Sequence, residues 1–97
     1  MARLIRSPRA AIDVADIVEY IAARNVSAAR RLLDRFDDLF HRLADNPQMG
    51  QKRDDLAASA RTISIGSYVV VFRPVVGGVE IIRVVHGARD IDSLFAD

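Results

Sequence analysis

The sequence has 97 residues, no cysteine, and 14 basic against 13 acidic residues, so its formal net charge is +1. A chain of this length predicts one small domain, residues 1–97, without room for a separate regulatory module. The absence of cysteine excludes disulfide frameworks and thiolate metal sites, and it suits a reducing cytoplasm. His41 and His86 lack metal-ligand spacing, so we expect neither a metal nor a cofactor.

The charged residues and the hydropathy pattern narrow the function classes. Only one of the fourteen basic residues is lysine, which favours planar guanidinium pairing over a diffuse nucleic-acid surface. No segment approaches the ~20 apolar residues that would cross a bilayer, and no long apolar run follows the basic N-terminus. We therefore expect a soluble, unprocessed cytoplasmic protein that does not bind a membrane.

The chain begins with a predicted strand and helix. Residues 3–6 form a short apolar and basic run, and Ser7-Pro8 supplies an N-cap followed by proline at the first helical position. Apolar residues then recur at helical spacing as far as Ile21. Asn25 is a candidate left-handed stop for this helix.

A second helix is predicted from a cap at Ser27 to Asn46-Pro47. Because only one or two residues separate it from the first helix, the two should form an antiparallel hairpin. Its apolar stripe consists of Ala29, Leu32, Leu33, Phe36, Leu39, Phe40 and Leu43.

The period of the apolar residues changes to two after a charged loop at residues 47–60. Three strands joined by two-residue glycine turns follow, and Asp90 caps a short C-terminal helical turn. This order predicts an α+β fold in which the helical hairpin packs on one face of a mainly antiparallel sheet. The strands are Arg61–Ile65, Tyr68–Val76 and Val79–His86, with turns at Gly66-Ser67 and Gly77-Gly78.

Two-residue turns fix the cross-strand register, so alternation assigns each strand side chain to a face. The heavier apolar face is assigned to the helices, which leaves the other face with an apolar centre and a polar rim. Such a patch usually marks a protein partner. Partial cover by the loop at 47–60 or by the C-terminal turn is the open alternative. The predicted partner surface consists of Val69, Val71, Arg73, Ile82, Val84, His86 and Arg89.

The same register places Arg83 on the helix-facing side, in one row with Arg61 and Phe72. A buried guanidinium must find acids. We therefore expect a structural ion pair between Arg83 and acids of the first helix, which are Asp13, Asp16 and Glu19.

Several segments resemble the RelE/ParE superfamily of type II toxin–antitoxin toxins: Pro47–Gly50, Gly66–Arg73 and above all Val79–Asp90. The resemblance covers nearly the whole chain. RelE-like members cleave mRNA on the ribosome, whereas ParE-like members inhibit DNA gyrase, and a co-expressed antitoxin wraps and neutralises both. The resemblance implies a cognate ParD-like antitoxin, a ribbon-helix-helix repressor, in a hetero-oligomeric complex that meets DNA only through the antitoxin. We expect the antitoxin to bind the partner surface predicted above.

The ParE-like branch is favoured by chemistry. Cleaving RNA through its 2'-hydroxyl needs groups that exchange a proton and cations that hold charge on the phosphate. At the positions that match the RelE-like cations and tyrosine, this sequence has Thr62, Ser64, Val69 and Phe95, and it keeps only Arg89. We therefore expect a gyrase inhibitor that acts by binding, without catalytic residues.

Two alternatives stay open. Histidine titrates near neutral pH, so a RelE-like ribosome-dependent mRNA endoribonuclease would use His86 as general base, with Arg89 and Arg73 as phosphate clamps. The second alternative is a toxin homologue that has lost its activity and acts in complex formation and autoregulation.

Overall fold

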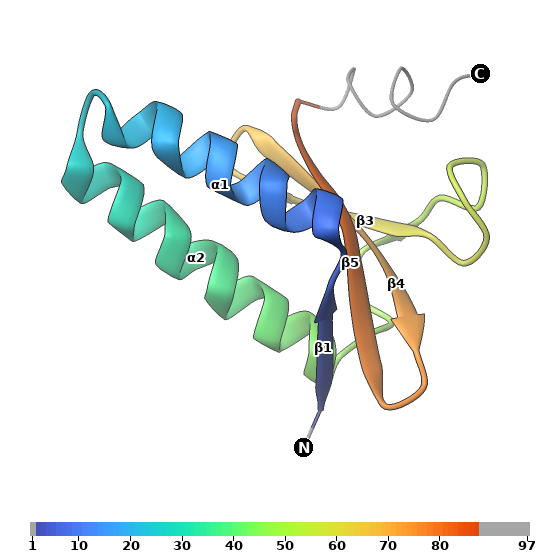
Figure 1. Ribbon diagram of the computed structural model, residues 1–97. Coiled ribbons are helices and arrows are strands. Elements are labelled where there is room, and N and C mark those ends of the chain that lie inside the picture. Colours follow the sequence, from blue (N-terminus) through green and yellow to red (C-terminus); the bar gives the residue numbers. More distant parts are fainter. Residues whose placement is uncertain (1, 88–97) are drawn as a thin grey trace.

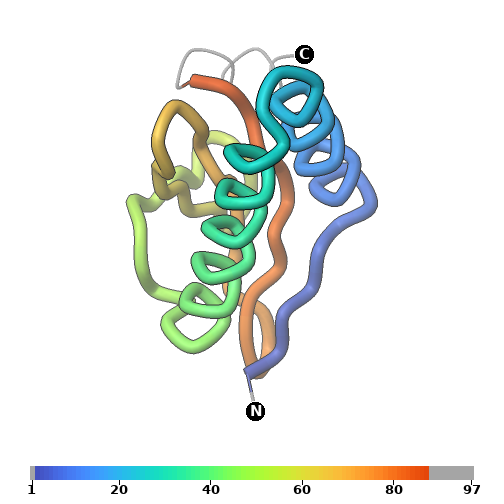
Figure 2. The backbone as a smooth tube through the Cα atoms, turned by 90° about the vertical axis from the view of Figure 1, so that its left-hand side faces the viewer, coloured from blue at the N-terminus to red at the C-terminus, as the bar shows by residue number. Residues whose placement is uncertain are grey.

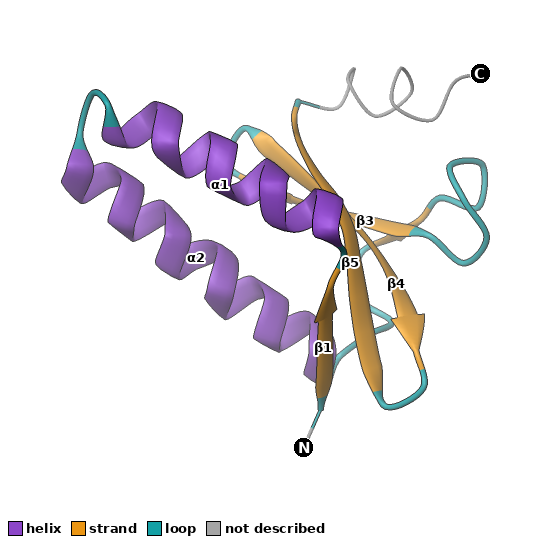
Figure 3. Cartoon of the chain, viewed as in Figure 1, coloured by secondary structure: helices purple, strands orange, loops and turns teal. Residues whose placement is uncertain are grey.

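The computed structural model describes residues 2–87. This part of the chain contains two helices packed as a hairpin on one face of a five-stranded sheet (Figure 1, Figure 3). The α+β class and the predicted order of the elements are confirmed. The predicted C-terminal turn lies outside the described residues. The elements are β1 Arg3–Arg6, α1 Pro8–Ala22, α2 Val26–Asp45, β2 Gln51–Lys52, β3 Arg61–Ile65, β4 Tyr68–Val75 and β5 Gly78–His86.

The strands lie in the order β1-β5-β4-β3-β2. β1 pairs with β5 in parallel, and the other neighbours pair antiparallel. Figure 2 shows β1 in blue beside β5 in orange, so the first and last described strands are neighbours. β2 is an addition to the predicted elements, because two residues are too few to give a periodic signal.

The caps of the two helices differ in how well the sequence predicts them. Ser7 caps α1, since its Oγ accepts a hydrogen bond from the Ala10 N–H at 3.0 Å and Pro8 follows at the first helical position. Asn25 is extended (φ −157°), and its Oδ1 accepts from the Ala28 N–H at 2.9 Å. Asn25 is therefore the cap of α2, and both the left-handed stop there and the cap at Ser27 were wrong.

The core lies between α2 and the helix-facing side of the sheet. Phe36 is fully buried, and its ring centroid lies 6.0 Å from that of Phe40 and 5.9 Å from that of Tyr68. Leu33 belongs to the predicted stripe but is 38% exposed, because it lies at the margin of the helix face. The buried strand residues of this core are Ile65, Val70, Phe72, Val79, Ile81 and Val84.

A β-bulge reverses the faces of β5 part-way along the strand. Phe72 is opposite Ile81 but Val71 is opposite Arg83, so Ile82 has no partner on β4. One extra residue moves every later side chain to the other face. Val84 consequently packs in the core beneath the helices, and the predicted placement of Val84 on the open face was wrong.

The same irregularity corrects two further predictions about β5. His86 is opposite Tyr68 and so lies on the helix-facing side of the sheet. The row of Arg61, Phe72 and Arg83 does not form, because Phe72 meets Ile81 instead. The turn before β5 is also one residue earlier than predicted, since Val75 pairs with Gly78.

The face of the sheet that points away from the helices is covered in part by the loop before β3 (Figure 1). Leu56 of this loop packs against Val69 and Val85, which are 6% and 7% exposed. Val71 is fully buried. The predicted open apolar patch was therefore wrong, and cover by the loop, the alternative, is what the structure shows.

Within residues 2–87, neither helix has the length and apolar character needed to span a membrane.

Candidate functional site

Asp13 of α1 and Arg83 of β5 form a buried ion pair. Arg83 Nε and Nη2 donate to Asp13 Oδ2 and Oδ1 at 2.8 Å and 3.2 Å, and the Val84 N–H donates to Oδ2 at 2.9 Å. The two side chains are only 8% and 17% exposed. β1 pairs with β5 only as far as Ile81, so the Asp13 carboxylate takes the place of a neighbouring strand. The pair holds α1 against β5.

The other two acids predicted to meet Arg83 lie elsewhere. Asp16 and Glu19 are exposed on α1, and among the described residues neither forms an ion pair with Arg83. Asp13 is supported from its own helix by Arg9, whose Nε lies 3.6 Å from Oδ1. Of the three acids predicted to meet Arg83, Asp13 is the one that contacts it.

Arg73 and His86, two of the three residues of the nuclease alternative, are far apart. Arg73 on β4 donates from Nε to Glu80 Oε1 at 2.7 Å. The His86 ring stands edge-on to the Tyr68 ring, with the centroids 5.1 Å apart. Tyr68 and Arg73 are five positions apart on one strand, which is about 17 Å, and an odd separation puts them on opposite faces. Arg89 lies outside the described residues.

His86 contributes to a hollow between α1 and the ends of β4 and β5. The hollow has a volume of about 400 Å³, and Asp16, Ile17, Tyr20, Tyr68 and His86 line it. Tyr20 is 62% exposed, and the Arg24 guanidinium stacks over its ring at 4.1 Å. The end of β5 thus contributes Arg83 to a buried ion pair and His86 to this hollow.

Arg61 anchors the loop between α2 and β2, a role that the sequence did not reveal. Its Nε donates to the Met49 carbonyl at 2.8 Å, and Nη2 donates to the carbonyls of Gln48 and Gly50. Gly50 has φ +79°, and a Cβ there would collide with the Thr62 carbonyl. The backbone of this turn therefore lies directly against β3, where no side chain would fit.

The covering loop is itself held by a bidentate ion pair. Arg53 Nε and Nη2 donate to Asp55 Oδ1 and Oδ2, each at 3.0 Å. The hydrogen bonds from Arg53 lower the pKa of Asp55 below its ordinary value of 3.8. This pair flanks Leu56, the residue that covers Val69 and Val85.

Replacing Arg53 by glutamine should return the pKa of Asp55 toward its ordinary value, because the charged donor is lost. A depressed pKa means that the pair contributes at pH values above the ordinary pKa and is lost as pH falls through the folded value. A carboxyl-detected NMR titration of Asp55 measures this directly. Asp54 serves as the internal control, and an unchanged Asp55 titration in the variant would contradict the assignment.

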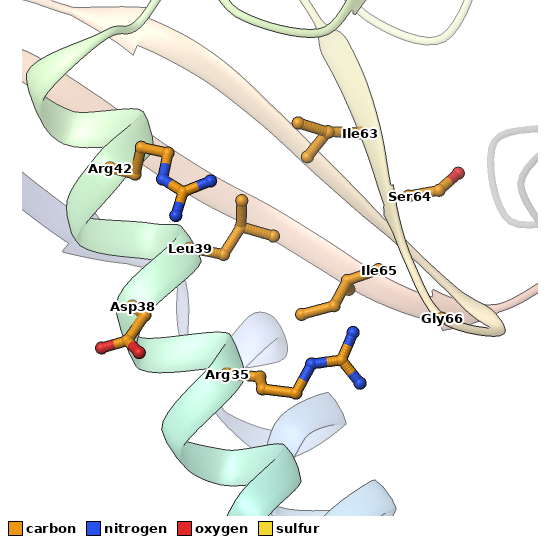
Figure 4. Close-up of a pocket in the computed structure, with 8 residues that line it drawn as sticks. All are labelled: Arg35, Asp38, Leu39, Arg42, Ile63, Ser64, Ile65 and Gly66. Carbon is orange, nitrogen blue, oxygen red and sulfur yellow. The ribbon is translucent and has the colours of Figure 1, made fainter.

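A groove lies between α2 and β3 on the helix side of the sheet. Figure 4 shows Arg35 and Arg42 extending from α2 toward β3, while Asp38 points away from the strand. Leu39, Ile63 and Ile65 form the apolar part of the lining. Within residues 2–87 neither arginine has an ion-pair partner within 4 Å.

Comparison with known proteins identifies the family. Residues 4–91 match the family described as ParE toxin of type II toxin-antitoxin system, parDE. The chain belongs to the ParE toxin family. The match includes β5, and with it the Asp13–Arg83 pair and His86.

Individual ParE proteins support this membership. Toxin ParE3 of Caulobacter vibrioides is 30% identical over 92 residues, which cover 94% of this chain and 92% of that protein. Toxin ParE1 of the same organism is 38% identical over 81 residues, covering 82% and 83% of the two chains.

A solved structure supports the fold. A chain of the chromosomal ParDE TA system from P. aeruginosa superposes with a TM-score of 0.74 at 18% identity, covering 90% of this chain and 97% of that one. The resemblance to the RelE/ParE superfamily and the preference for its ParE branch are therefore confirmed.

Proposed function

We propose that this ParE-family toxin inhibits DNA gyrase by binding it, and that a cognate ParD-like antitoxin of the ribbon-helix-helix class neutralises it in a hetero-oligomeric complex. The proposed mechanism is non-enzymatic. Family membership supports the toxin–antitoxin part of the proposal.

The separation of Arg73 from His86 is the observation that favours binding over RNA cleavage. Phosphate chemistry needs a proton-transfer group and cations around one phosphate. Here Arg73 is engaged by Glu80, and His86 lies against Tyr68 at the other end of β4. A single phosphate could not contact both side chains.

The residues at the RelE-like cation positions favour the same conclusion. Thr62 and Val69 are buried, at 8% and 6% exposed, and Ser64 carries no charge. Neutral side chains at these positions would leave a cleaving phosphate without electrostatic support.

Purified full-length protein should inhibit the supercoiling of relaxed plasmid by DNA gyrase, and its expression should induce the DNA-damage response. His86→Ala should retain this inhibition, because inhibition by binding does not need His86 as a general base. A translating extract with a defined mRNA, assayed in parallel, measures the competing nuclease activity.

Two results would reject the proposal, and a third would change only the role of His86. Unaffected gyrase at saturating protein, together with transcript cleavage that His86→Ala abolishes, would establish the endoribonuclease. Inhibition that disappears in His86→Ala would show that this residue acts at the target. Normal growth on overexpression without antitoxin would indicate a toxin homologue that has lost its activity.

A further inference from the structure

The outer edge of β3 is only partly paired. β4 pairs with β3 along its whole length, whereas β2 pairs only with Arg61 and Thr62. Ile65 and Tyr68 close a two-residue turn and therefore exchange hydrogen bonds, as do the alternate pairs toward the start of the strand. The N–H and C=O of Ser64 consequently point away from β4, and no described strand lies beside them.

The position of Thr62 supports this orientation. Thr62 lies two residues before Ser64 on β3, so the backbone N–H and C=O groups of the two residues point the same way. The Thr62 carbonyl faces outward against Gly50 on the β2 side. Beyond Thr62 the described edge continues as Ile63-Ser64-Ile65, without the lysine, proline or bulge that usually protects an exposed edge. An unprotected apolar edge is a template for another strand.

The groove beside this edge favours acidic side chains. Arg35 and Arg42 reach over it from α2 and have no ion-pair partner within the described residues (Figure 4). Between them, Leu39 and Ile65 are only 9% and 8% exposed, so a partner would find a small apolar floor. Within residues 2–87, the combination is a main-chain edge without a neighbouring strand, flanked by two guanidinium groups without ion-pair partners and by an apolar surface.

We propose that this edge is a docking site where an extended acidic segment of a partner protein adds to the sheet as a further strand beside Ser64. Main-chain pairing supplies affinity in such complexes, and alternate side chains supply specificity. Glutamates on the helix-facing side of the added strand would meet Arg35 and Arg42 with their carboxylates and the groove floor with their methylene groups. The alternate residues would face the other side of the sheet. The inference rests on the proposed function only for the source of the segment, which is the antitoxin.

A synthetic peptide of alternating glutamate and valine, blocked at both ends, tests the site without antitoxin or gyrase. Titrated calorimetrically into the full-length protein, it should bind in preference to the same peptide with lysine for glutamate. Ser64→Pro should weaken binding about tenfold, since it removes one outward N–H but no bond to β4, and edge strands accept proline. N-methylation of the peptide should weaken binding of the wild-type protein in the same way.

The charge requirement has a matched control. Arg35→Glu/Arg42→Glu should weaken binding at least about tenfold, whereas Arg24→Glu/Arg30→Glu makes the same charge change at exposed positions outside the groove. Circular dichroism establishes that each variant is folded, and the N-methylated peptide tests main-chain pairing even if Ser64→Pro does not fold.

Several outcomes would overturn the docking site. They are the absence of binding at millimolar peptide, equal binding of the lysine peptide, and affinity that is insensitive to both Ser64→Pro and N-methylation. A wild-type dimer that Ser64→Pro dissociates in sedimentation would assign the edge to a second copy of this chain instead. Because the titration contains no gyrase, its failure would leave the gyrase result standing, and the reverse also holds.

Discussion

Replacing Asp13 by alanine should lower the free energy of unfolding by about 3–5 kcal/mol, the usual result of removing one partner of a buried ion pair. The variant would leave the Arg83 guanidinium, 17% exposed, without its carboxylate. It would also leave the Val84 N–H without its acceptor. Urea unfolding followed by circular dichroism measures the loss.

Asp16→Ala is the matched control for this prediction. Asp16 is one turn further along α1 and exposed, so its replacement should change stability by less than about 0.5 kcal/mol. Asp13→Asn keeps an oxygen acceptor for Val84 but loses the charge, so its loss should be intermediate. Equal stability of the Asp13 and Asp16 variants would show that the ion pair does not hold α1 on the sheet.

Replacing Phe36 by alanine should destabilise the fold by a similar amount, about 3–5 kcal/mol, because it opens a cavity in the centre of the core. Phe36 is fully buried and contacts the rings of Phe40 and Tyr68, so it joins α2 to β4. Thermal or urea unfolding of the full-length variant measures this effect.

Leu33→Ala provides the comparison, because both residues belong to the apolar stripe that the sequence predicts for α2. Leu33 is 38% exposed, so its truncation should cost less than about 1 kcal/mol. Comparable losses at the two positions would mean that the helix is rotated from the orientation described, with Leu33 in the core.

The elements were predictable because their signals are local. The change of period from helical to two, the Ser7-Pro8 start of α1 and the Gly66 turn each depend on a few neighbouring residues. The bounds of β3 agree with the prediction, and those of β4 and β5 differ by one residue. Asn25 illustrates the limit of such signals, since a residue suited to ending one helix is equally suited to capping the next.

The faces of β5 were not predictable because they depend on a count along the whole strand. The extra residue, Ile82, has a side chain that does not distinguish it from its neighbours. The hydrogen bonds at the bulge come from Ser7, which is distant in the sequence. Ser7 Oγ donates to the Ile82 carbonyl at 2.8 Å, and the Ser7 N–H donates to the Ile81 carbonyl. A side-chain register deduced from turns alone therefore holds only up to the first bulge.

Only part of the candidate site was predictable from the sequence. Charge complementarity indicated that Arg83 needs an acid from the first helix, and the structure places it against Asp13 although the predicted row was wrong. The role of Arg61, whose acceptors are main-chain carbonyls, leaves no pattern in the sequence. The edge at Ser64, beside which no described strand lies, was not predictable either, because it follows from where the short strand β2 stops.

The adjacency of β1 and β5 has a consequence for the order of folding. The start of the chain meets β5 through contacts such as Ser7 to Ile82 and Asp13 to Val84, which are 75 and 71 residues apart. Contacts of such separation close late, because the loop entropy is lost before they form. During synthesis, β1 can already meet α2, through Arg6 and Asp37, but it lacks its main-chain partner until β5 has been made. The main-chain pairing of β1 is therefore completed only by β5, the last of the described strands.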